Sequence, residues 1–345
     1  MSFLLNIWYV AAHAHELDDG IVARKICDQD LVLFRTDAGQ PAALVDRCPH
    51  RFVPLSLGNV VGDTLQCAYH GLRFDGSGAC VEAPNDTDER RAQICVRSFP
   101  MVERHGYAWI WMGDAEKADP SLIPVFEFMD DPKMAVSTGY NYMKGNYQLI
   151  SDNLLDLSHV HYLHPEVHPG ADFSNFTNKV KIEGDTVWSM LWRHQYPIDE
   201  GRKALWGFKS LDVEGQGHAR WNAPSVLLIS TAFWDHGTSF EEGAQTPNAH
   251  MLTPETAYST HYFWSTGRNF HIEDENITKA TSENVGRIFG TQDGPMIEAQ
   301  QRVMGESDKF VEMAPEILSA DAAGLAARRI LKRMIDAEAR ERETP

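Results

Sequence analysis

Two cysteines and two histidines, arranged as two short mixed pairs, are the residues of this chain best suited to chemistry. Cys48 and His50 stand in C-P-H, and Cys67 and His70 stand in C-A-Y-H-G, with 16 residues between His50 and Cys67. Two thiolates and two imidazoles suit a [2Fe–2S] cluster in which histidines replace the cysteines on one iron. Structural zinc also takes two Cys and two His, but its usual spacing pairs like with like. The mixed pairs favour the cluster, and zinc is the alternative.

A second group of polar residues lies on one predicted helix, N-Y-Q-L-I-S-D-N-L-L-D-L-S-H-V-H-Y-L-H-P. Asn153, Asp156 and His159 form a row beside an apolar stripe, where buried polar groups must bond or bind metal. A solvated helix face is the alternative. His159 and His164 are about 140° apart on a regular α-helix. Binding one metal therefore requires a π-like bulge or an unwound last turn, and Pro165 favours unwinding.

The rest of the sequence predicts the elements that hold these groups. Short apolar or alternating runs bounded by Gly, Asp and Pro predict strands, and helical spacing returns near the C-terminus. The predicted strands are 31–35, 42–45, 107–112, 186–193, 225–231 and 258–265, and the predicted closing helices are about 272–301 and 320–340. Because strands and helices are segregated rather than alternating, we expect an α+β fold.

Composition excludes several classes of protein. The 31 Lys and Arg against 49 Asp and Glu give a net charge of −18, which disfavours nucleic acid or an anionic membrane as a partner. No apolar run approaches the ~20 residues that a membrane-spanning helix needs. Five cysteines are too few, and odd in number, for a disulfide framework, so we expect a cytoplasmic protein.

The two Cys/His loops resemble those of the Rieske non-haem iron oxygenases. The resemblance extends over C-P-H-R-F-V-P-L-S-L-G and C-A-Y-H-G-L-R-F-D-G-S-G. It implies that Cys48 and Cys67 bind one iron of a [2Fe–2S] cluster and that His50 and His70 bind the other. It also implies an all-β Rieske domain over residues 1–115. A helix-grip-like catalytic domain, an antiparallel sheet with covering helices, would occupy residues 116–345.

The predicted polar helix resembles the mononuclear iron motif of the same family, Asp-x-x-His-x₄-His. The resemblance implies that His159 and His164 bind Fe(II) as neutral imidazoles. A carboxylate would complete a facial triad that leaves coordination positions open. The family takes this carboxylate from a helix near the C-terminus, and G-T-Q-D-G-P-M-I-E-A-Q-Q-R is similar to that segment. We expect Asp293 to be the ligand, with Glu298 as the second choice.

Further roles follow from the resemblance. Asp156 would bond His159 and reach His70 of the partner subunit, which would make it the electron bridge between the two centres. Asn153 would border the iron pocket, although a helix-stabilising role is equally consistent with its position. His250 stands where the family lines its pocket and would contact the substrate; an exposed strand histidine is the alternative.

Two arginines are candidate counter-charges for an acidic substrate. They are Arg193, which ends the predicted strand 186–193, and Arg220; an ordinary surface position is the favoured interpretation of both.

Segments spread over nearly the whole chain are similar to the vanillate O-demethylase and dicamba monooxygenase branch of the family. They include N-x-W-Y-V-A, S-D-N-L-L-D-L-S-H, M-L-T-P-E-T and F-W-S-T-G-R-N-F. The resemblance implies a monooxygenase that attacks a methoxy C–H of an aromatic acid, giving a hemiacetal that collapses to a phenol and formaldehyde. Methyl or ring hydroxylation is the alternative. More remote alternatives are a cluster-only electron-transfer protein and a zinc-stabilised binding module.

The sequence also predicts partners. No G-x-G-x-x-G follows a predicted strand, and no second cysteine set exists for a plant-type cluster. We therefore expect electrons to come from a separate NAD(P)H-dependent reductase, with flavin and iron–sulfur groups, or from a ferredoxin. The other expected partners are O₂ and a small aromatic substrate. A homotrimer is implied by the resemblance alone.

Overall fold

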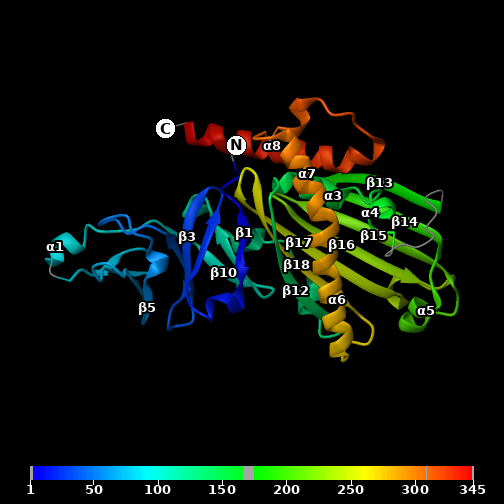
Figure 1. Cartoon of the computed structure of the whole chain (residues 1–345), viewed down its shortest axis with the longest axis horizontal. Coiled ribbons are helices and arrows are strands. Elements are labelled where there is room, and N and C mark those ends of the chain that lie inside the picture. The colour runs from blue at the N-terminus through cyan, green and yellow to red at the C-terminus, as the bar shows by residue number, and fades with distance from the viewer. Residues whose placement is uncertain (1–2, 85, 166–174, 308, 344–345) are drawn as a thin grey trace. The chain divides into compact units, whose positions relative to one another are not determined.

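Two compact units make up the protein in the computed structural model, which describes residues 3–84, 86–165, 175–307 and 309–343 (Figure 1). The first unit comprises residues 3–123 and takes in residues 253–257 from later in the chain. The second comprises residues 124–252 and the chain from Tyr258 onwards. No described helix is both long and apolar enough to cross a lipid bilayer.

The first unit is built from three small β-sheets. Their strand orders are β1-β11-β10, β2-β3-β4-β9 and β5-β6-β7-β8. The strands are β1 (Trp8–His13), β2 (Val22–Ile26), β3 (Gln29–Arg35), β4 (Pro41–Val45), β5 (Asn59–Val61), β6 (Thr64–Gln66), β7 (Arg73–Asp75), β8 (Cys80–Glu82), β9 (Ser98–Phe99), β10 (Met101–Arg104) and β11 (Tyr107–Trp111), with one short helix, α1 (Asp88–Arg91). The strands predicted at 31–35, 42–45 and 107–112 are thus present as β3, β4 and β11.

The second unit is a seven-stranded sheet with helices packed against it. The strand order is β12-β18-β17-β16-β15-β14-β13, and neighbouring strands from β13 to β17 pair antiparallel, as do β12 and β18. The strands are β12 (Ala135–Met143), β13 (Phe176–Glu183), β14 (Thr186–Pro197), β15 (Asp212–Asn222), β16 (Val226–Trp234), β17 (Ala244–Thr256) and β18 (Ser259–Arg268). Together the two units confirm the predicted α+β class.

Burial along the strands reflects what covers each face. In β15 buried and half-buried positions alternate, as expected when the two faces of a strand differ in their cover. In β18 every position is buried, because helices α2 and α6 pack on a strand that already lies between two others.

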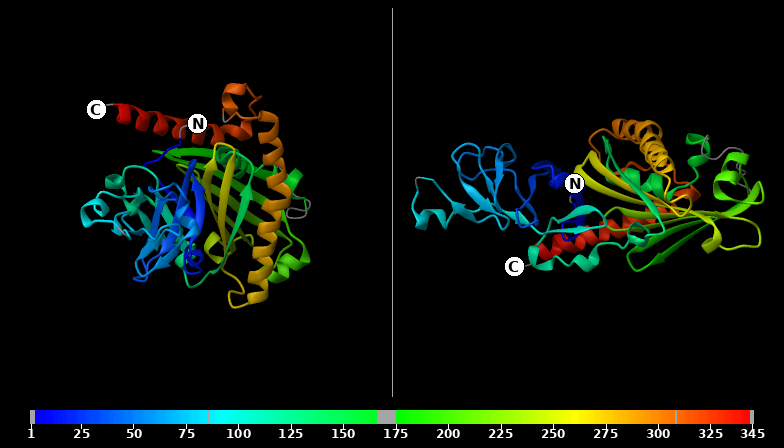
Figure 2. Two further views of the ribbon diagram at one scale, coloured as in Figure 1. Left: turned by 60° about the vertical axis from the view of Figure 1, so that its left-hand side comes forward. Right: turned by 90° about the horizontal axis from the view of Figure 1, so that it is seen from below.

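The helices lie mainly in the second half of the chain. They are α2 (Glu127–Asp130), α3 (Tyr147–Leu155), α4 (Val160–Leu163), α5 (Glu200–Trp206), α6 (Glu275–Ile288), a π-helical turn (Phe289–Asp293), α7 (Gly294–Met304) and α8 (Ala322–Glu343). Figure 2 shows α6 lying against one side of the curved sheet. The helix predicted at about 272–301 is therefore one rod interrupted by a π turn. In α8, which corresponds to the helix predicted at about 320–340, Ala323, Ala327 and Leu331 lie on one face and are buried.

One ion pair ties α3, which carries the predicted polar row, to the C-terminal helix. The Arg328 guanidinium donates to both carboxylate oxygens of Asp152, at 2.6–3.1 Å, and lies 5.0 Å from the ring centre of Phe310. Burial raises the pKa of Asp152, and the charge of Arg328 offsets part of that rise. Removing the arginine would leave a carboxylate in a desolvated place without its cation.

We predict that Arg328→Gln lowers the free energy of unfolding of the second unit by roughly 3 kcal/mol, because the desolvated Asp152 loses its partner. Thermal unfolding followed by circular dichroism measures the change. The matched control is Arg333→Gln, since Arg333 pairs with Asp185 where both side chains are largely exposed. Such a pair contributes about 0–1 kcal/mol. Equal unfolding midpoints for the two variants would contradict the structural role given to the Asp152–Arg328 pair.

Candidate functional site

Two loops in the first unit, residues 48–53 and 67–72, carry the predicted cluster ligands and have matching backbones. In each loop the cysteine N–H donates to the carbonyl five residues later: Cys48 to Val53 at 2.9 Å and Cys67 to Leu72 at 2.8 Å. In each loop the residue four places on donates back to the cysteine carbonyl. The residue at that place has positive φ, 61° at Phe52 and 76° at Gly71, as the tight turn requires. The two loops therefore share these hydrogen bonds and the positive φ, while the histidine stands two residues after the cysteine in the first loop and three in the second.

In both loops the cysteine side chain is buried and the histidine side chain is exposed. Cys48 and Cys67 are 1% and 2% exposed, at the end of a hydrophobic core, whereas His50 and His70 are exposed and their ring centres lie 4.5 Å apart. Burial, together with the neighbouring Cys67 thiol, raises the pKa of Cys48 to about 11. A buried pair of thiolates therefore needs a cation beside it. An inner cysteine pair and an outer histidine pair fit a cluster with one iron at each level.

A second cluster of potential ligands lies in the second unit. One ligand atom each from His159, His164 and Asp293 lies within 4.8 Å of the others. Asp293 Oδ1 is 3.5 Å from His159 Nε2 and 3.2 Å from His164 Nε2. Glu298 is not part of this cluster: its Oε1 accepts a hydrogen bond from the Lys144 backbone N–H at 3.1 Å.

The helix predicted to run through His159 and His164 is broken ahead of His159. Helix α3 ends at Leu155, residues 157–159 form a turn, and α4 begins at Val160. His164, next to Pro165, has φ −124° and ψ 51°, outside the α region, as expected for a residue that precedes proline. The departure from α geometry that the five-residue spacing requires therefore lies at His164, where the last turn unwinds, and a separate break precedes His159.

Each imidazole is oriented through its other ring nitrogen. His159 Nδ1–H donates to the Asp156 main-chain carbonyl at 2.5 Å, and His164 Nδ1–H donates to Gln292 Oε1 at 2.6 Å. Both bonds leave Nε2 unprotonated and directed at the Asp293 carboxylate, the arrangement found for metal-binding histidines. Gln292 is a functional residue that the sequence reasoning missed; its place beside Asp293 was the only available signal.

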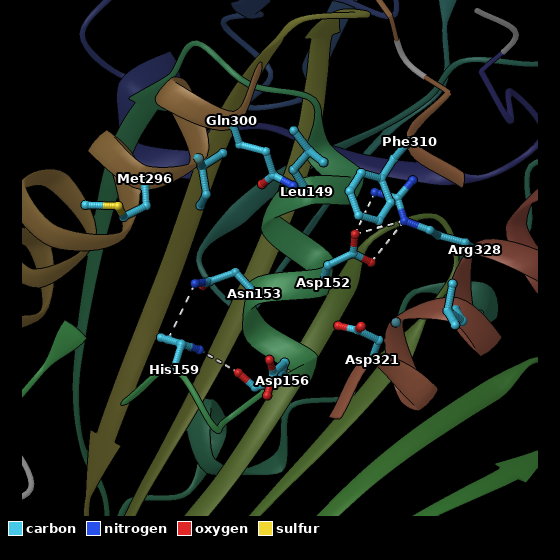
Figure 3. A pocket seen from close by; sticks show the side chains of 13 residues that line it. Leu149, Asp152, Asn153, Asp156, His159, Met296, Gln300, Phe310, Asp321 and Arg328 are labelled. Atoms are coloured by element: carbon cyan, nitrogen blue, oxygen red, sulfur yellow. Dashed lines mark hydrogen bonds and ion pairs between the residues drawn. The ribbon is translucent and has the colours of Figure 1, made fainter. Parts of the chain in front are cut away.

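Asp156 contacts His159 through a different atom from the one predicted. The carboxylate was expected to bond the imidazole, but the main-chain carbonyl does so, since Asp156 follows the last residue of α3. Asp156 Oδ1 instead accepts the Ser158 N–H at 2.8 Å. Figure 3 shows Asp156 and Asn153 on two sides of His159, in a pocket that is bordered by α3, α7 and α8.

A π turn brings Asp293 to the histidines. The Gly294 N–H donates to the Phe289 carbonyl, five residues back, and the wider turn places Asp293 at 2% exposure. A Cβ on Gly294 would lie 2.8 Å from the Phe289 oxygen, so this position requires glycine. Pro295 has no N–H to donate and falls in the first turn of α7, where none is needed.

The environment of Asp293 fits a bound cation. Burial alone would raise the pKa of this carboxyl, but the two imidazoles that face it hold the pKa well below its usual range when they are protonated. Neutral imidazoles have no proton on Nε2 to donate, and a metal cation would take that place. Asn153 Nδ2 donates to Oδ1 at 3.1 Å. Asp293 Oδ2 is buried and has no hydrogen-bond partner among the described residues. Two unprotonated imidazole nitrogens and an unsatisfied carboxylate oxygen form a donor set suited to Fe(II).

A cavity of about 200 Å³ opens beside this donor set. Apolar side chains form much of its wall, and the polar lining includes His250, which is 1% exposed. The Tyr262 hydroxyl lies 2.8 Å from His250 Nδ1, and burial lowers the pKa of His250 to about 3. His250 is therefore a neutral pocket residue and not an exposed strand histidine.

The two candidate arginines differ in position. Arg193 lines the cavity and is 5% exposed, so its interpretation as a surface residue is wrong. Arg220 is half-buried on β15, outside the cavity lining, where it donates to the Val125 carbonyl at 2.9 Å.

Comparison with known families matches both units. Residues 7–100 match the Rieske [2Fe-2S] domain, and residues 143–337 match the vanillate O-demethylase oxygenase C-terminal domain. The first match decides for the [2Fe–2S] cluster against zinc. The second match assigns an oxygenase domain to residues 143–337, and a protein that only transfers electrons would not need one.

Similar proteins cover nearly the whole chain. The oxygenase component of dicamba O-demethylase from Stenotrophomonas maltophilia is 38% identical, over 98% of this chain and 100% of that protein. An iron-sulfur subunit of the toluene-4-sulfonate monooxygenase system from Comamonas testosteroni is 34% identical, over 97% and 98%.

The fold has also been seen before. The crystal structure of dicamba monooxygenase bound to 3,6-dichlorosalicylic acid superposes with a TM-score of 0.91 at 36% identity, over 98% of this chain and 99% of that one. The chain therefore belongs to the Rieske non-haem iron oxygenases, as the oxygenase component of a monooxygenase system.

Proposed function

We propose that this oxygenase O-demethylates a methoxylated aromatic acid, yielding a phenol and formaldehyde. The observation that carries the proposal is the cavity beside His159, His164 and Asp293, whose apolar walls suit an aromatic ring. The identity to a dicamba O-demethylase component supports the reaction type. In balance, Ar–O–CH₃ and O₂ with two electrons and two protons give Ar–OH, formaldehyde and water.

The proposed ligands follow from the two donor sets. They are Cys48 and Cys67 on the inner iron and His50 and His70 on the outer iron of the cluster, with His159, His164 and Asp293 on the mononuclear iron. When bound, the cluster supplies single electrons, and the mononuclear iron supplies open coordination positions for O₂ beside the substrate.

The surrounding residues position these groups and the substrate. Gln292 and the Asp156 carbonyl hold the two imidazoles, and Asn153 holds Oδ1 of Asp293. The neutral His250 offers Nε2, which is buried and has no hydrogen-bond partner within the described chain, to an oxygen of the substrate. The apolar wall excludes water from the methoxy carbon.

Electrons reach an oxygenase component of this kind from a separate reductase or ferredoxin. We propose further that the chain forms a head-to-tail homotrimer, in which the Asp156 carboxylate bonds His70 of the partner subunit. Asp156 lines an open pocket together with Asn153 and His159 (Figure 3) and is not part of the substrate-cavity lining, which supports this role.

Methyl hydroxylation is the second candidate reaction. The relative from the toluene-4-sulfonate monooxygenase system is 34% identical over 97% of this chain, close to the value for the dicamba relative. Sequence identity of this order assigns a chain to a family but does not identify its substrate. The reaction product must therefore distinguish demethylation from methyl hydroxylation.

We predict that pre-reduced protein, mixed once with O₂ and a panel of methoxylated aromatic acids, forms phenol and formaldehyde in equal amounts. Each demethylation releases one molecule of both, so chromatography and a formaldehyde assay on the same quench measure the reaction. Methylated aromatic acids and sulfonates in parallel reactions serve as the comparison. A hydroxylated product without formaldehyde would rule out the demethylase and favour the second candidate.

We predict that Asp293→Ala lowers the iron content from about three to about two atoms per chain, while the cluster absorption is unchanged. The variant removes one of three ligands from the second unit and none from the first. Iron analysis and visible spectroscopy of the same sample measure both effects. Glu298→Ala is the matched control, since Glu298 bonds only the Lys144 backbone in the described structure and should keep all the iron. Full iron content in Asp293→Ala would remove Asp293 from the ligand set.

We predict that Asp156→Asn retains both metal centres but lowers turnover by at least about 100-fold. The amide oxygen still accepts the Ser158 N–H, so the loop keeps its conformation, while the charge proposed to bridge two subunits is lost. Steady-state turnover and the rate of electron transfer from the reduced cluster are the measurements. Turnover equal to that of the unchanged protein would exclude the bridge.

A further inference from the structure

Arg193 is a buried cation, and two of its three guanidinium nitrogens have no hydrogen-bond partner among the described residues. It lies on β14 with 5% of its surface exposed, and neither Nε nor Nη1 finds a hydrogen-bond partner among the residues that the structure describes. Burial lowers its pKa to about 10, with no offset from a described carboxylate, so the guanidinium is charged at neutral pH. A buried charge without a partner is unfavourable unless a ligand supplies one.

Three aromatic rings hold the guanidinium in place. Its central carbon lies 5.9 Å, 6.0 Å and 5.5 Å from the ring centres of Phe176, Tyr196 and Phe233. Ring faces attract the charge but do not accept in-plane N–H bonds as a carboxylate does. A Cβ on Gly217 would lie 3.0 Å from both Nη atoms, so glycine gives the guanidinium room at this point of β15.

The same cavity contains Arg193 and the metal-ligand set. The helical segments contribute His159, His164 and Asp293, while the sheet contributes Arg193 and the neutral His250. Between them the wall is mostly apolar, with Leu154, Leu157, Ile229, Val285, Ile288 and Phe289. Apart from a metal ion, Arg193 is the only permanent cation in the described lining.

We infer that Arg193 binds an oxyanion substituent of the aromatic substrate, a carboxylate or a sulfonate, and thereby selects anionic substrates. This inference rests on the proposed function, because it assumes that the cavity beside the ligand set is the substrate site. The guanidinium N–H groups would donate to two oxyanion oxygens in a planar, two-point contact. The apolar wall would then hold the ring.

The test compares acids with their neutral amides. Isothermal titration of the oxidised holoenzyme with 2-, 3- and 4-methoxybenzoate, 4-methoxybenzenesulfonate and the matching amides measures affinity without turnover. We expect the unchanged protein to prefer at least one acid over its amide. Arg193→Gln should lower the affinity for that acid about 100-fold and change the affinity for its amide by less than about threefold. Arg220→Gln, on the neighbouring strand but outside the cavity lining, is the control and should keep the preference.

Three results would overturn the inference: an unchanged protein without any preference for acids, an Arg193→Gln variant that binds the acid normally, or one that loses acid and amide alike. Iron content and the cluster spectrum of each variant separate a local effect from misfolding. The proposed function fails independently, if the acids bind in an Arg193-dependent way but yield no phenol and formaldehyde. A sulfonate preferred over the carboxylates would assign the oxyanion without changing the role of Arg193.

Discussion

The burial of the Asp293 carboxylate is the constraint on which the second unit depends. A carboxylate that is 2% exposed must find donors or a cation. Asn153 donates to one oxygen, the unprotonated Nε2 atoms of two imidazoles face that same oxygen, and the other oxygen has no partner among the described groups. The π turn at Phe289–Asp293, between α6 and α7, is the point at which the Asp293 side chain is directed into the protein interior. The break after α3 and the bond from His164 to Gln292 then fix both imidazoles toward the same oxygen.

The first unit shows why the two loops that carry the proposed cluster ligands could be recognised from the sequence. Each loop is closed by hydrogen bonds between residues no more than five apart, so a short motif specifies both the ligands and their geometry. The mononuclear site is different: the bond from His164 to Gln292 joins residues 128 positions apart. Sequence spacing indicated that the helix through His159 and His164 must depart from α geometry. Pro165 indicated the last turn, where His164 leaves the α region. The break ahead of His159 was not predicted, and there the Asp156 carbonyl accepts from His159.

Six strands and the class of fold were predicted from short apolar or alternating runs, whereas β12, β13, β15 and β17 of the large sheet were not. Arg193 was not, because its surroundings come from three separate strands: Phe176 on β13, Tyr196 on β14 and Phe233 on β16. An arginine in an alternating strand has the same sequence pattern whether its side chain faces solvent or a cavity. Only the curvature of the sheet and the cover of helices decide which.

The net charge of the whole protein and the local charge of the cavity have opposite signs. The protein carries a net charge of −18, which repels small anions at long range. Within the cavity the balance is reversed, since a divalent metal ion and Arg193 outweigh the single carboxylate of Asp293. Interactions between charges are stronger in a desolvated cavity than across solvent, where salt screens them within about 10 Å. If the substrate is the anionic aromatic acid that we propose, it would gain most of its attraction after it has entered, and the cavity would favour acids over neutral analogues of the same shape.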